Sequence, residues 1–221
     1  MRSSKLERRN IQTLKDPHFS KESFRVACKR VWRAQSAWDI RDHKITMRLK
    51  AILSPIKARH ILIYSPMPKE ADIRALIKWL RPKAKLLAPI TQAQGLKITP
   101  YRLPLQKNAY QILEPRLSSL ATPTLDVVLV PILGLEGAFL RIGFGKGFYD
   151  RFFATLKTRP YTIFIARKLL YTPQLLGQAH DIQAHLCVDQ NHLYQLQNKI
   201  KRKSNDKYRF KHAVLMRSYG R

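Results

Sequence analysis

The sequence predicts a three-layer α/β/α domain with a mostly parallel central sheet. Short apolar runs of strand length alternate along the chain with segments whose apolar residues recur at helical spacing. The apolar runs are continuous, which is typical of parallel strands covered on both faces. With 221 residues, 45% of them hydrophobic, the chain is long and apolar enough for a single domain with its own core.

A first helix is predicted from residue 22, where apolar positions recur at i, i+3, i+4, i+7 and i+8. They are Phe24, Ala27, Cys28, Val31 and Trp32. Lysine or arginine recurs at every fourth position on another face, at 21, 25, 29 and 33, and forms a basic ridge. The spacing of isoleucines and leucines predicts a second helix over residues 43–53, just before Pro55.

Five short apolar runs are predicted to be strands. They cover residues 60–64, 85–89, 126–131, 161–165 and 186–188. Helical spacing predicts a helix over 70–80, between the first two strands, and another that begins in the glycine-rich run 141–151. Pro89 is expected to end the second strand, because proline has no N–H for a sheet hydrogen bond. The proline-rich region 96–123 is expected to contain no long helix.

One α/β domain is expected over residues 20–195. Residues 1–19 show no periodicity, lack the apolar stretch of a secretory signal, and are expected to be mobile. The longest apolar run, 127–135, is too short to span a membrane. The two cysteines, Cys28 and Cys187, are far apart and form neither a disulfide framework nor a metal motif. We therefore expect a cytoplasmic monomer without a membrane contact.

The formal net charge of +28 raises the question of a nucleic-acid partner. Residues 199–221 carry nine lysines and arginines and one acid, so this segment contributes +8 and the rest of the chain contributes +20. The larger part of the charge is thus spread over the body rather than gathered in one patch. We expect 196–221 to be a solvated basic tail, and contact of this tail with nucleic acid is the less favoured interpretation.

The most informative segment is the glycine-rich run 141–151, which reads Arg-Ile-Gly-Phe-Gly-Lys-Gly-Phe-Tyr-Asp-Arg and holds 3 of the 8 glycines. Alternate glycines let backbone N–H groups approach an anion, and the helix predicted to follow favours an anion at its N-terminus. A nucleotide phosphate is therefore the first ligand to consider. The spacing differs from the dinucleotide fingerprint, and Lys146 is followed by glycine rather than by the Ser/Thr of a Walker A loop.

This run closely resembles the signature of the 5-formyltetrahydrofolate cyclo-ligase family, in which a strand ending in proline and an acidic turn precede R-L-G-x-G-x-G-Y-Y-D. Pro131, Glu136 and residues 141–150 keep that order and spacing. Shorter matches are Lys21 with Arg25, Ser65 with Glu70, Glu114-Pro115 and His180-Asp181. The resemblance covers residues 20–190. The departures from the family pattern are Glu136 for aspartate, Phe139 for glycine, Ile142 for leucine and Phe148 for tyrosine.

The resemblance implies an enzyme that uses ATP and Mg²⁺ to convert 5-formyltetrahydrofolate, a reduced formyl folate, into 5,10-methenyltetrahydrofolate. The formyl oxygen is phosphorylated, the amine at position 10 attacks the activated carbon, and phosphate leaves. Such a site mainly has to position the substrates and neutralise the phosphoryl group. Arg141 and Lys146 are the predicted catalytic residues, because their charges suit phosphate oxygens.

ATP is predicted to contact the first helix and the glycine-rich run. The residues are Lys21, Glu22, Ser23, Phe24, Arg25, Arg141, Ile142, Gly143, Phe144, Gly145, Lys146, Gly147, Phe148 and Tyr149. The folate is predicted to contact Ser65, Glu70 and Tyr149. Asp150 and Asp181 are the predicted Mg²⁺ ligands, because this ion prefers carboxylate oxygens and usually bridges to substrate phosphates.

Structural interpretations of the same residues stay open. Lys21 and Arg25 also fit a solvated basic ridge, Asp150 and Glu70 fit charges at helix N-termini, and Asp181 fits a turn. Two other functions stay open as well. One is a nucleic-acid-binding protein that has the same fold without catalysis, and the other is an ATP-dependent enzyme acting on another pterin-like metabolite.

Overall fold

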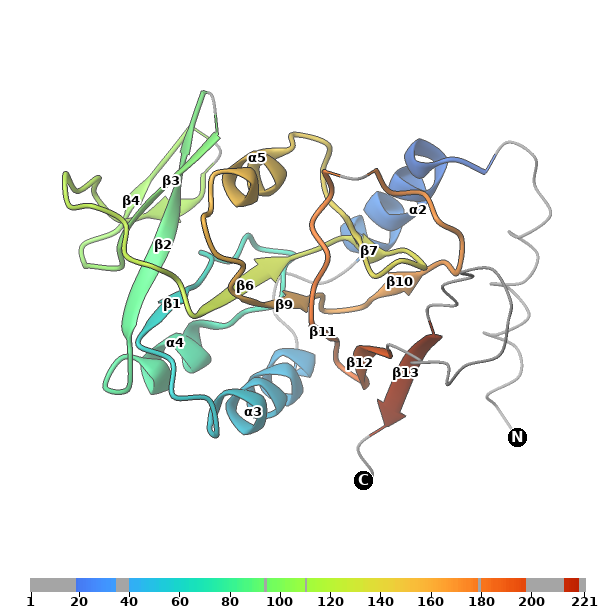
Figure 1. Ribbon diagram of the computed structural model, residues 1–221, viewed down its shortest axis with the longest axis horizontal. Helices are drawn as coiled ribbons and strands as arrows, with labels where there is room; N and C mark the ends of the chain where they lie inside the picture. Colours follow the sequence, from blue (N-terminus) through green and yellow to red (C-terminus); the bar gives the residue numbers. More distant parts are fainter. Residues whose placement is uncertain are drawn as a thin grey trace, which may run out of the picture.

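The computed structural model describes residues 19–34, 40–93, 95–109, 111–178, 180–197 and 213–218 (Figure 1). The N-terminal segment 1–19, expected to be mobile, lies outside the described residues except for Phe19. Most of the predicted basic tail, including 198–212, also lies outside them.

An eight-stranded sheet forms the centre of the fold, in the order β13-β12-β11-β9-β6-β1-β2-β3. The five central strands in this order, β11-β9-β6-β1-β2, are parallel to one another. They are β1 (His60–Leu62), β2 (Lys85–Gln92), β6 (Val127–Pro131), β9 (Tyr161–Ile165) and β11 (Leu186–Val188). Antiparallel strands extend both edges: β3 (Gly95–Pro100) pairs with β2, and β12 (His192–Gln197) pairs with β11. The mostly parallel sheet that the apolar runs predicted is therefore confirmed.

The segment predicted to be a tail contains a further strand. β13 (Ala213–Ser218) pairs antiparallel with β12 over six residues and is the outermost strand of the sheet. β12 itself runs to Gln197, past the expected domain boundary. β12 is paired on both sides and β13 on its inner side, so these parts of their backbones make hydrogen bonds within the sheet.

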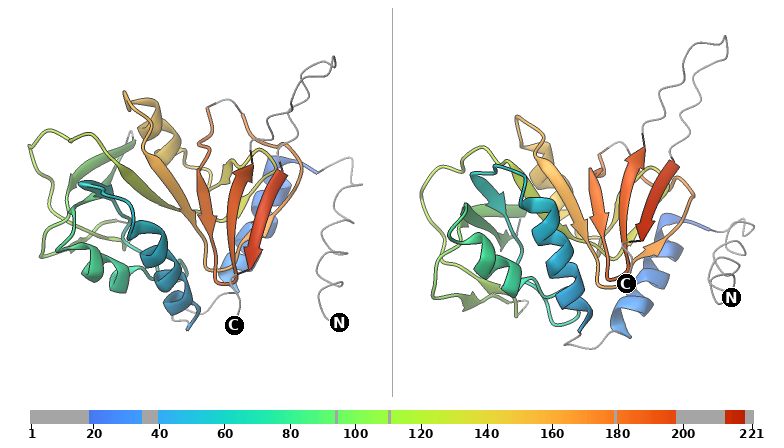
Figure 2. Two further views of the ribbon diagram at one scale, coloured as in Figure 1. Left: turned by 60° about the horizontal axis from the view of Figure 1, so that its bottom comes forward. Right: turned by 90° about the horizontal axis from the view of Figure 1, so that it is seen from below.

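Helices cover both faces of the sheet (Figures 1 and 2). On one face, α3 (Arg41–Leu53) and α4 (Arg74–Leu80) pack on residues such as Ile61 and Val127. The neighbouring residues Leu62 and Val128 point to the other face, where they share a cluster with Phe152 of α5 (Phe148–Ala154). This alternation is that of β-strands buried on both sides, and it confirms the three-layer α/β/α class.

The remaining helix, α2 (Lys21–Arg33), packs at the edge of this second layer. Ser20 caps its N-terminus: the side chain accepts the N–H of Ser23, and the Ser23 side chain accepts the N–H of Ser20. Phe24 and Cys28 are buried against Leu133 and Ile142. The amphipathic pattern therefore predicted the buried face of this helix correctly.

Several element boundaries differ from the sequence prediction; β1, for example, ends at Leu62 rather than at residue 64. Two of the differences have a clear physical reason. The helix expected from residue 70 begins only at Arg74, because the Asp72 carboxylate accepts the Arg74 N–H (2.9 Å) and residues 70–73 form a loop before it. The second strand continues through Pro89, which was expected to end it. Pro89 lies beyond Leu87, the last β2 residue paired with β1, so its missing N–H interrupts no bond on that side.

The proline-rich region is more regular than expected. It contains β3, which forms a long hairpin with β2, and a small two-stranded sheet of β4 (Gln106–Lys107) and β5 (Leu113–Glu114). As predicted, it has no long helix among its described residues.

A three-stranded sheet of β7 (Gly134–Leu135), β8 (Arg141–Ile142) and β10 (Leu170–Tyr171) connects the core to the glycine-rich run. The turn between β7 and β8 forms around Glu136, whose side chain is fully buried. The Glu136 carboxylate accepts four backbone N–H groups, from Ala138, Leu140, Leu176 and Gly177, at 2.8–3.4 Å. This carboxylate therefore fixes the turn from which β8 starts.

Phe139, in the same turn, has a φ of +64°, in the left-handed region that favours glycine. Glycine is common at this position in the family pattern, and the backbone conformation supplies the reason. The Phe139 ring is fully buried in the cluster that includes Phe152 and Phe164. Burial of the ring thus offsets the backbone strain.

This balance predicts an unusual order of stability. Phe139→Ala and Phe139→Gly both remove the ring, a loss of about 3–5 kcal/mol. Only the glycine variant also relieves the strain, so Phe139→Gly should be the more stable of the two by about 0.5–1 kcal/mol. Urea unfolding of both variants measures the difference. A glycine variant less stable than the alanine variant, the usual order in a core, would contradict the strain.

Candidate functional site

A cavity of about 530 Å³ opens at the carboxyl ends of the parallel strands. The parallel strands lie in the order β2-β1-β6-β9-β11, so the chain moves to one side after β1 and returns to the other side at β6. This reversal is the topological switch point at which open α/β sheets bind ligands. The cavity is lined by residues that follow β1, such as Ser65, and residues that follow β6, such as Leu133.

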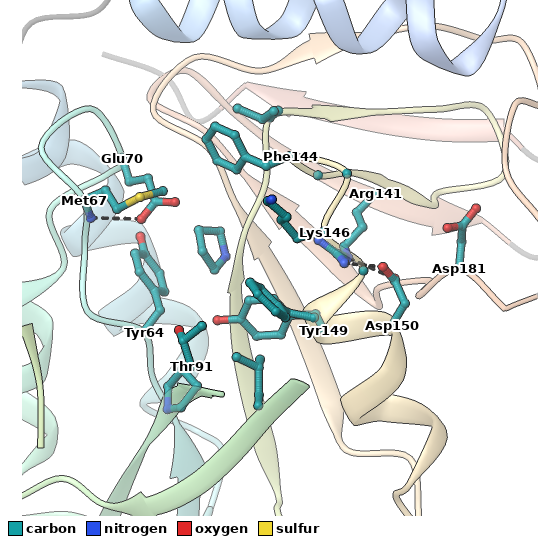
Figure 3. Close-up of a pocket in the computed structure, with 18 of the residues that line it drawn as sticks. Tyr64, Met67, Glu70, Thr91, Arg141, Phe144, Lys146, Tyr149, Asp150 and Asp181 are labelled. Atoms are coloured by element: carbon teal, nitrogen blue, oxygen red, sulfur yellow. Dashed lines mark hydrogen bonds and ion pairs between the residues drawn. The ribbon is translucent and has the colours of Figure 1, made fainter. Parts of the chain in front are cut away.

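The wall after β1 presents a carboxylate in a poorly hydrated position. Glu70 accepts the Met67 N–H (3.0 Å), and the Tyr64 hydroxyl donates to the Ala71 carbonyl (2.8 Å), so the loop is held from both ends (Figure 3). Burial raises the pKa of Glu70 to about 7, although the Met67 N–H and the charge of Arg167 offset part of the effect. The Glu70 carboxyl is therefore partly protonated near neutral pH.

Ser65 stands on the same wall. Its hydroxyl is buried and has no hydrogen-bond partner among the described residues. A buried hydroxyl without a partner is unfavourable in the free protein, so this group is available to a ligand in the cavity.

The wall after β6 is the glycine-rich run, which is held by a buried ion pair (Figure 3). The Arg141 guanidinium donates to both oxygens of Asp150, from Nε to Oδ1 (3.2 Å) and from Nη2 to Oδ2 (2.5 Å). Arg141 also lies over the ring of Tyr149, 5.4 Å from its centre. The two ends of the run, in β8 and in the first turn of α5, are thereby joined.

Glycine is favoured at each of the three positions in the run for a structural reason. A Cβ on Gly143 would lie 2.5 Å from Nη1 of Arg141, so any other residue would displace the guanidinium that Asp150 holds. Gly145 and Gly147 have φ angles of +97° and +65°, which other residues adopt only with strain. The backbone therefore turns tightly around Lys146, whose exposed side chain lies in the cavity between Arg141 and the wall that carries Glu70 (Figure 3).

Helix α2 closes the cavity beside the glycine-rich run. Arg25 donates from Nε to the Gly143 carbonyl (3.1 Å), and Lys21 forms an ion pair with Asp181. The ring of Phe144 lies edge-on against Trp32, with the ring centres 5.0 Å apart. The predicted basic ridge thus supplies cavity residues.

Most of the predicted site residues lie together on the cavity. They are Lys21, Arg25, Ser65, Glu70, Arg141, Gly143, Phe144, Gly145, Lys146, Gly147, Phe148, Tyr149, Asp150 and Asp181. Four predicted ATP contacts do not line it. Phe24 and Ile142 are buried in the core, Ser23 belongs to the helix cap, and Glu22 pairs with Arg25 on the exposed side of α2.

The structure also places residues on the cavity that sequence reasoning missed, among them Met67, Thr91, Ile112 and Glu114. Thr91 was missed because Pro89 was expected to end its strand. Glu114 had a signal, since it belongs to the Glu-Pro dipeptide of the family pattern.

Both predicted Mg²⁺ ligands are engaged with cations. Asp150 is bound by Arg141, and Asp181 is bound by Lys21 and by the Gln178 N–H (2.7 Å). The described residues contain no group of three His, Cys, Asp or Glu side chains that could hold a metal ion. The Mg²⁺ assignment stays a prediction.

Among the described helices, none has the length and apolar character needed to cross a membrane. The monomeric state and the cytoplasmic location remain predictions, and so does the preference for a solvated tail over contact with nucleic acid.

Comparison with known proteins finds a matching family model and relatives that carry the name of the same family. The model of the 5-formyltetrahydrofolate cyclo-ligase family matches residues 19–190. A 5-formyltetrahydrofolate cyclo-ligase of Mus musculus is 27% identical over 183 residues, which cover 74% of this chain and 90% of the relative. A 5-formyltetrahydrofolate cyclo-ligase of Haemophilus influenzae is 28% identical over 143 residues, which cover 60% of this chain and 74% of the relative.

Two solved structures share the fold. The 5,10-methenyltetrahydrofolate synthetase of Aquifex aeolicus superposes with a TM-score of 0.65 at 21% identity, covering 85% of this chain and 97% of that one. The 5,10-methenyltetrahydrofolate synthetase of Mycoplasma pneumoniae gives a TM-score of 0.60 at 22% identity, and the match covers 76% of this chain and 98% of that one.

The raised pKa of Glu70 predicts a pH-dependent stability. Between its ordinary value of 4.5 and about 7, the folded protein keeps a proton that the unfolded chain has released. Stability is therefore lost as the pH rises through this range. Glu70→Gln removes the loss, so its Tm should exceed that of the wild type by more at pH 8 than at pH 5. An equal difference at both pH values would show that the Glu70 carboxyl is not desolvated.

Proposed function

The chain belongs to the 5-formyltetrahydrofolate cyclo-ligase family, and on that premise we propose that it converts 5-formyltetrahydrofolate into 5,10-methenyltetrahydrofolate at the expense of ATP. One observation carries the proposal. A single cavity at the switch point joins a cationic, glycine-rich wall suited to a triphosphate with a carboxylate wall suited to the N–H donors of a reduced pterin.

The proposed reaction transfers the γ-phosphoryl group of ATP to the formyl oxygen and releases ADP. The N10 amine then attacks the activated formyl carbon, the carbon–oxygen bond breaks, and phosphate leaves with that oxygen. The N10 proton is released, and the methenyl bridge remains. The protein must hold the two substrates in line and spread the charge of the transferred group over fixed donors.

The glycine-rich run is suited to the triphosphate. Lys146 has no carboxylate partner among the described residues, so its ammonium group can bind phosphate oxygens without first leaving another ion pair. Arg25 lies against the same loop, and the glycines leave the backbone N–H groups open to an anion. We propose that Lys146 acts directly on the transferred group and that Arg141 acts mainly by holding the loop.

We propose that a Mg²⁺ ion would be held largely by phosphate and water, with Asp150 or Asp181, which both line the cavity, as its protein ligand. Bound in this way, the ion would neutralise phosphate charge. Lys21 would then be free to bind the nucleotide instead of Asp181.

On the opposite wall, Glu70 and Ser65 are proposed to bind the pterin. A carboxylate accepts N–H donors best when ionised, and the Ser65 hydroxyl has no hydrogen-bond partner among the described residues. Tyr149 connects the walls: burial and the charge of Glu70 raise its pKa, while Arg141 offsets part of this. We propose that its ring, which lines the cavity beside the glycine-rich run, packs against the folate (Figure 3).

The test is a direct assay of the purified protein with 5-formyltetrahydrofolate, Mg²⁺ and ATP, following the absorbance of the methenyl product. Product should form only when ATP is present, with ADP and phosphate in equal amounts. Folded protein that gives no ATP-dependent product would overturn the proposal.

A matched pair of lysine variants serves as the control for that assay. Lys146→Ala should lower kcat by about 100-fold or more, because a positioned charge at the transferred group contributes on this scale. Lys157→Ala removes an exposed lysine outside the cavity and should leave kcat unchanged. Equal activity of the two variants would show that Lys146 has no part in the reaction.

A further inference from the structure

The third wall of the cavity carries a buried carboxylate to which no role has been assigned. This wall is built by the β2–β3 hairpin and by β5, and its side chains are mainly apolar, including Pro89, Leu96 and Ile112. Glu114, the last residue of β5, lies among them with only 7% of its surface exposed. A carboxylate in apolar surroundings is costly unless each oxygen has a partner.

Only one oxygen of Glu114 has a partner. Oε1 accepts the Thr91 N–H (3.0 Å) and the Thr91 hydroxyl (2.9 Å), which joins β5 to β2. Oε2 accepts no hydrogen bond, and the carboxylate has no ion pair, among the described residues. Oε2 is also not sealed in the interior, because Glu114 lines the cavity.

Glu136 shows how this fold satisfies a carboxylate whose role is structural. Each of its two oxygens accepts two backbone N–H groups, and no oxygen is left for a ligand. Glu114 is nearly as buried but uses one oxygen for structure and leaves the other unbound. A purely structural role explains Oε1 and leaves Oε2 without an explanation.

We propose that Glu114 is a second substrate-binding carboxylate, whose Oε2 accepts an N–H of the reduced pterin ring. This inference rests on the proposed function. A reduced pterin has N–H donors on more than one edge, so a single carboxylate at Glu70 cannot bind all of them. Thr91, which lies on the cavity wall (Figure 3), supports the contact through its hydrogen bonds to Glu114. Because its hydroxyl donates to Oε1, it holds the carboxylate in place and keeps its own oxygen available as an acceptor toward the cavity.

The decisive variant is Glu114→Gln. The Thr91 N–H requires an oxygen at the Oε1 position, so the amide is oriented with its NH₂ group where Oε2 was. The structural bond is kept, but the ligand meets a donor instead of an acceptor. The Kd for 5-formyltetrahydrofolate, measured without ATP by quenching of tryptophan fluorescence, should rise at least about tenfold. The Kd for ATP and the Tm should stay close to those of the wild type.

The alternatives give different results. An unchanged Kd for 5-formyltetrahydrofolate would show that Glu114 is structural only. A raised Kd for ATP with an unchanged Kd for the folate would mean that Glu114 binds the adenine amino group, which also overturns the inference. A wild-type protein that does not bind 5-formyltetrahydrofolate would instead overturn the proposed function, and the inference with it.

A second variant decides the question if Glu114→Gln does not fold. Thr91→Val keeps the carboxylate and the backbone N–H that holds it but removes the hydroxyl that donates to Oε1. Looser orientation of Glu114 should raise the Kd for 5-formyltetrahydrofolate at least about threefold, without an effect on ATP. Folded Thr91→Val with an unchanged Kd for the folate would overturn the inference.

Discussion

The glycine-rich run keeps its shape because Arg141 at one end is paired with Asp150 at the other. The guanidinium occupies the space that a Cβ at Gly143 would fill, so glycine at this position lets the ion pair keep its geometry. Both charged side chains are largely buried, at 8% and 17% exposure, so each depends on the other for compensation of its charge. The positions of Lys146, of the loop amides and of the start of α5 all follow from this pair.

The remainder of the fold brings this loop to a second, chemically different wall. The strand order places the residues after β1 and after β6 across one cavity. Cations are concentrated on the glycine-rich side, where Lys146 is free of ion pairs among the described residues, and desolvated carboxylates line the facing walls. A triphosphate and a nitrogen-rich ring have opposite electrostatic requirements, and the two sides of the cavity meet them separately.

The fold was predictable from the sequence because the parallel strands are continuous apolar runs. Such strands carry apolar side chains on both faces of the sheet, so helices must cover both faces. Features that depend on contacts between residues distant in the sequence were not predictable. Pro89 was expected to end a strand, but β1 had already ended beside it. Arg141 and Asp150 were assigned separately to phosphate and metal, since nothing in the sequence shows that they pair. Glu114 belonged to a recognised dipeptide, yet only the structure shows that it is buried and that its Oε2 accepts no hydrogen bond from a described residue.

The most direct test of the ion pair is the stability of Asp150→Asn without nucleotide or Mg²⁺. If Asp150 compensates the buried charge of Arg141, the free energy of unfolding should fall by about 2–4 kcal/mol. Asp72→Asn, which weakens a pair whose arginine, Arg74, is 71% exposed and so needs little compensation of its charge, should change it by less than about 1 kcal/mol. An Asp150→Asn protein as stable as the wild type in urea would contradict the account and would leave metal binding as the role of this carboxylate.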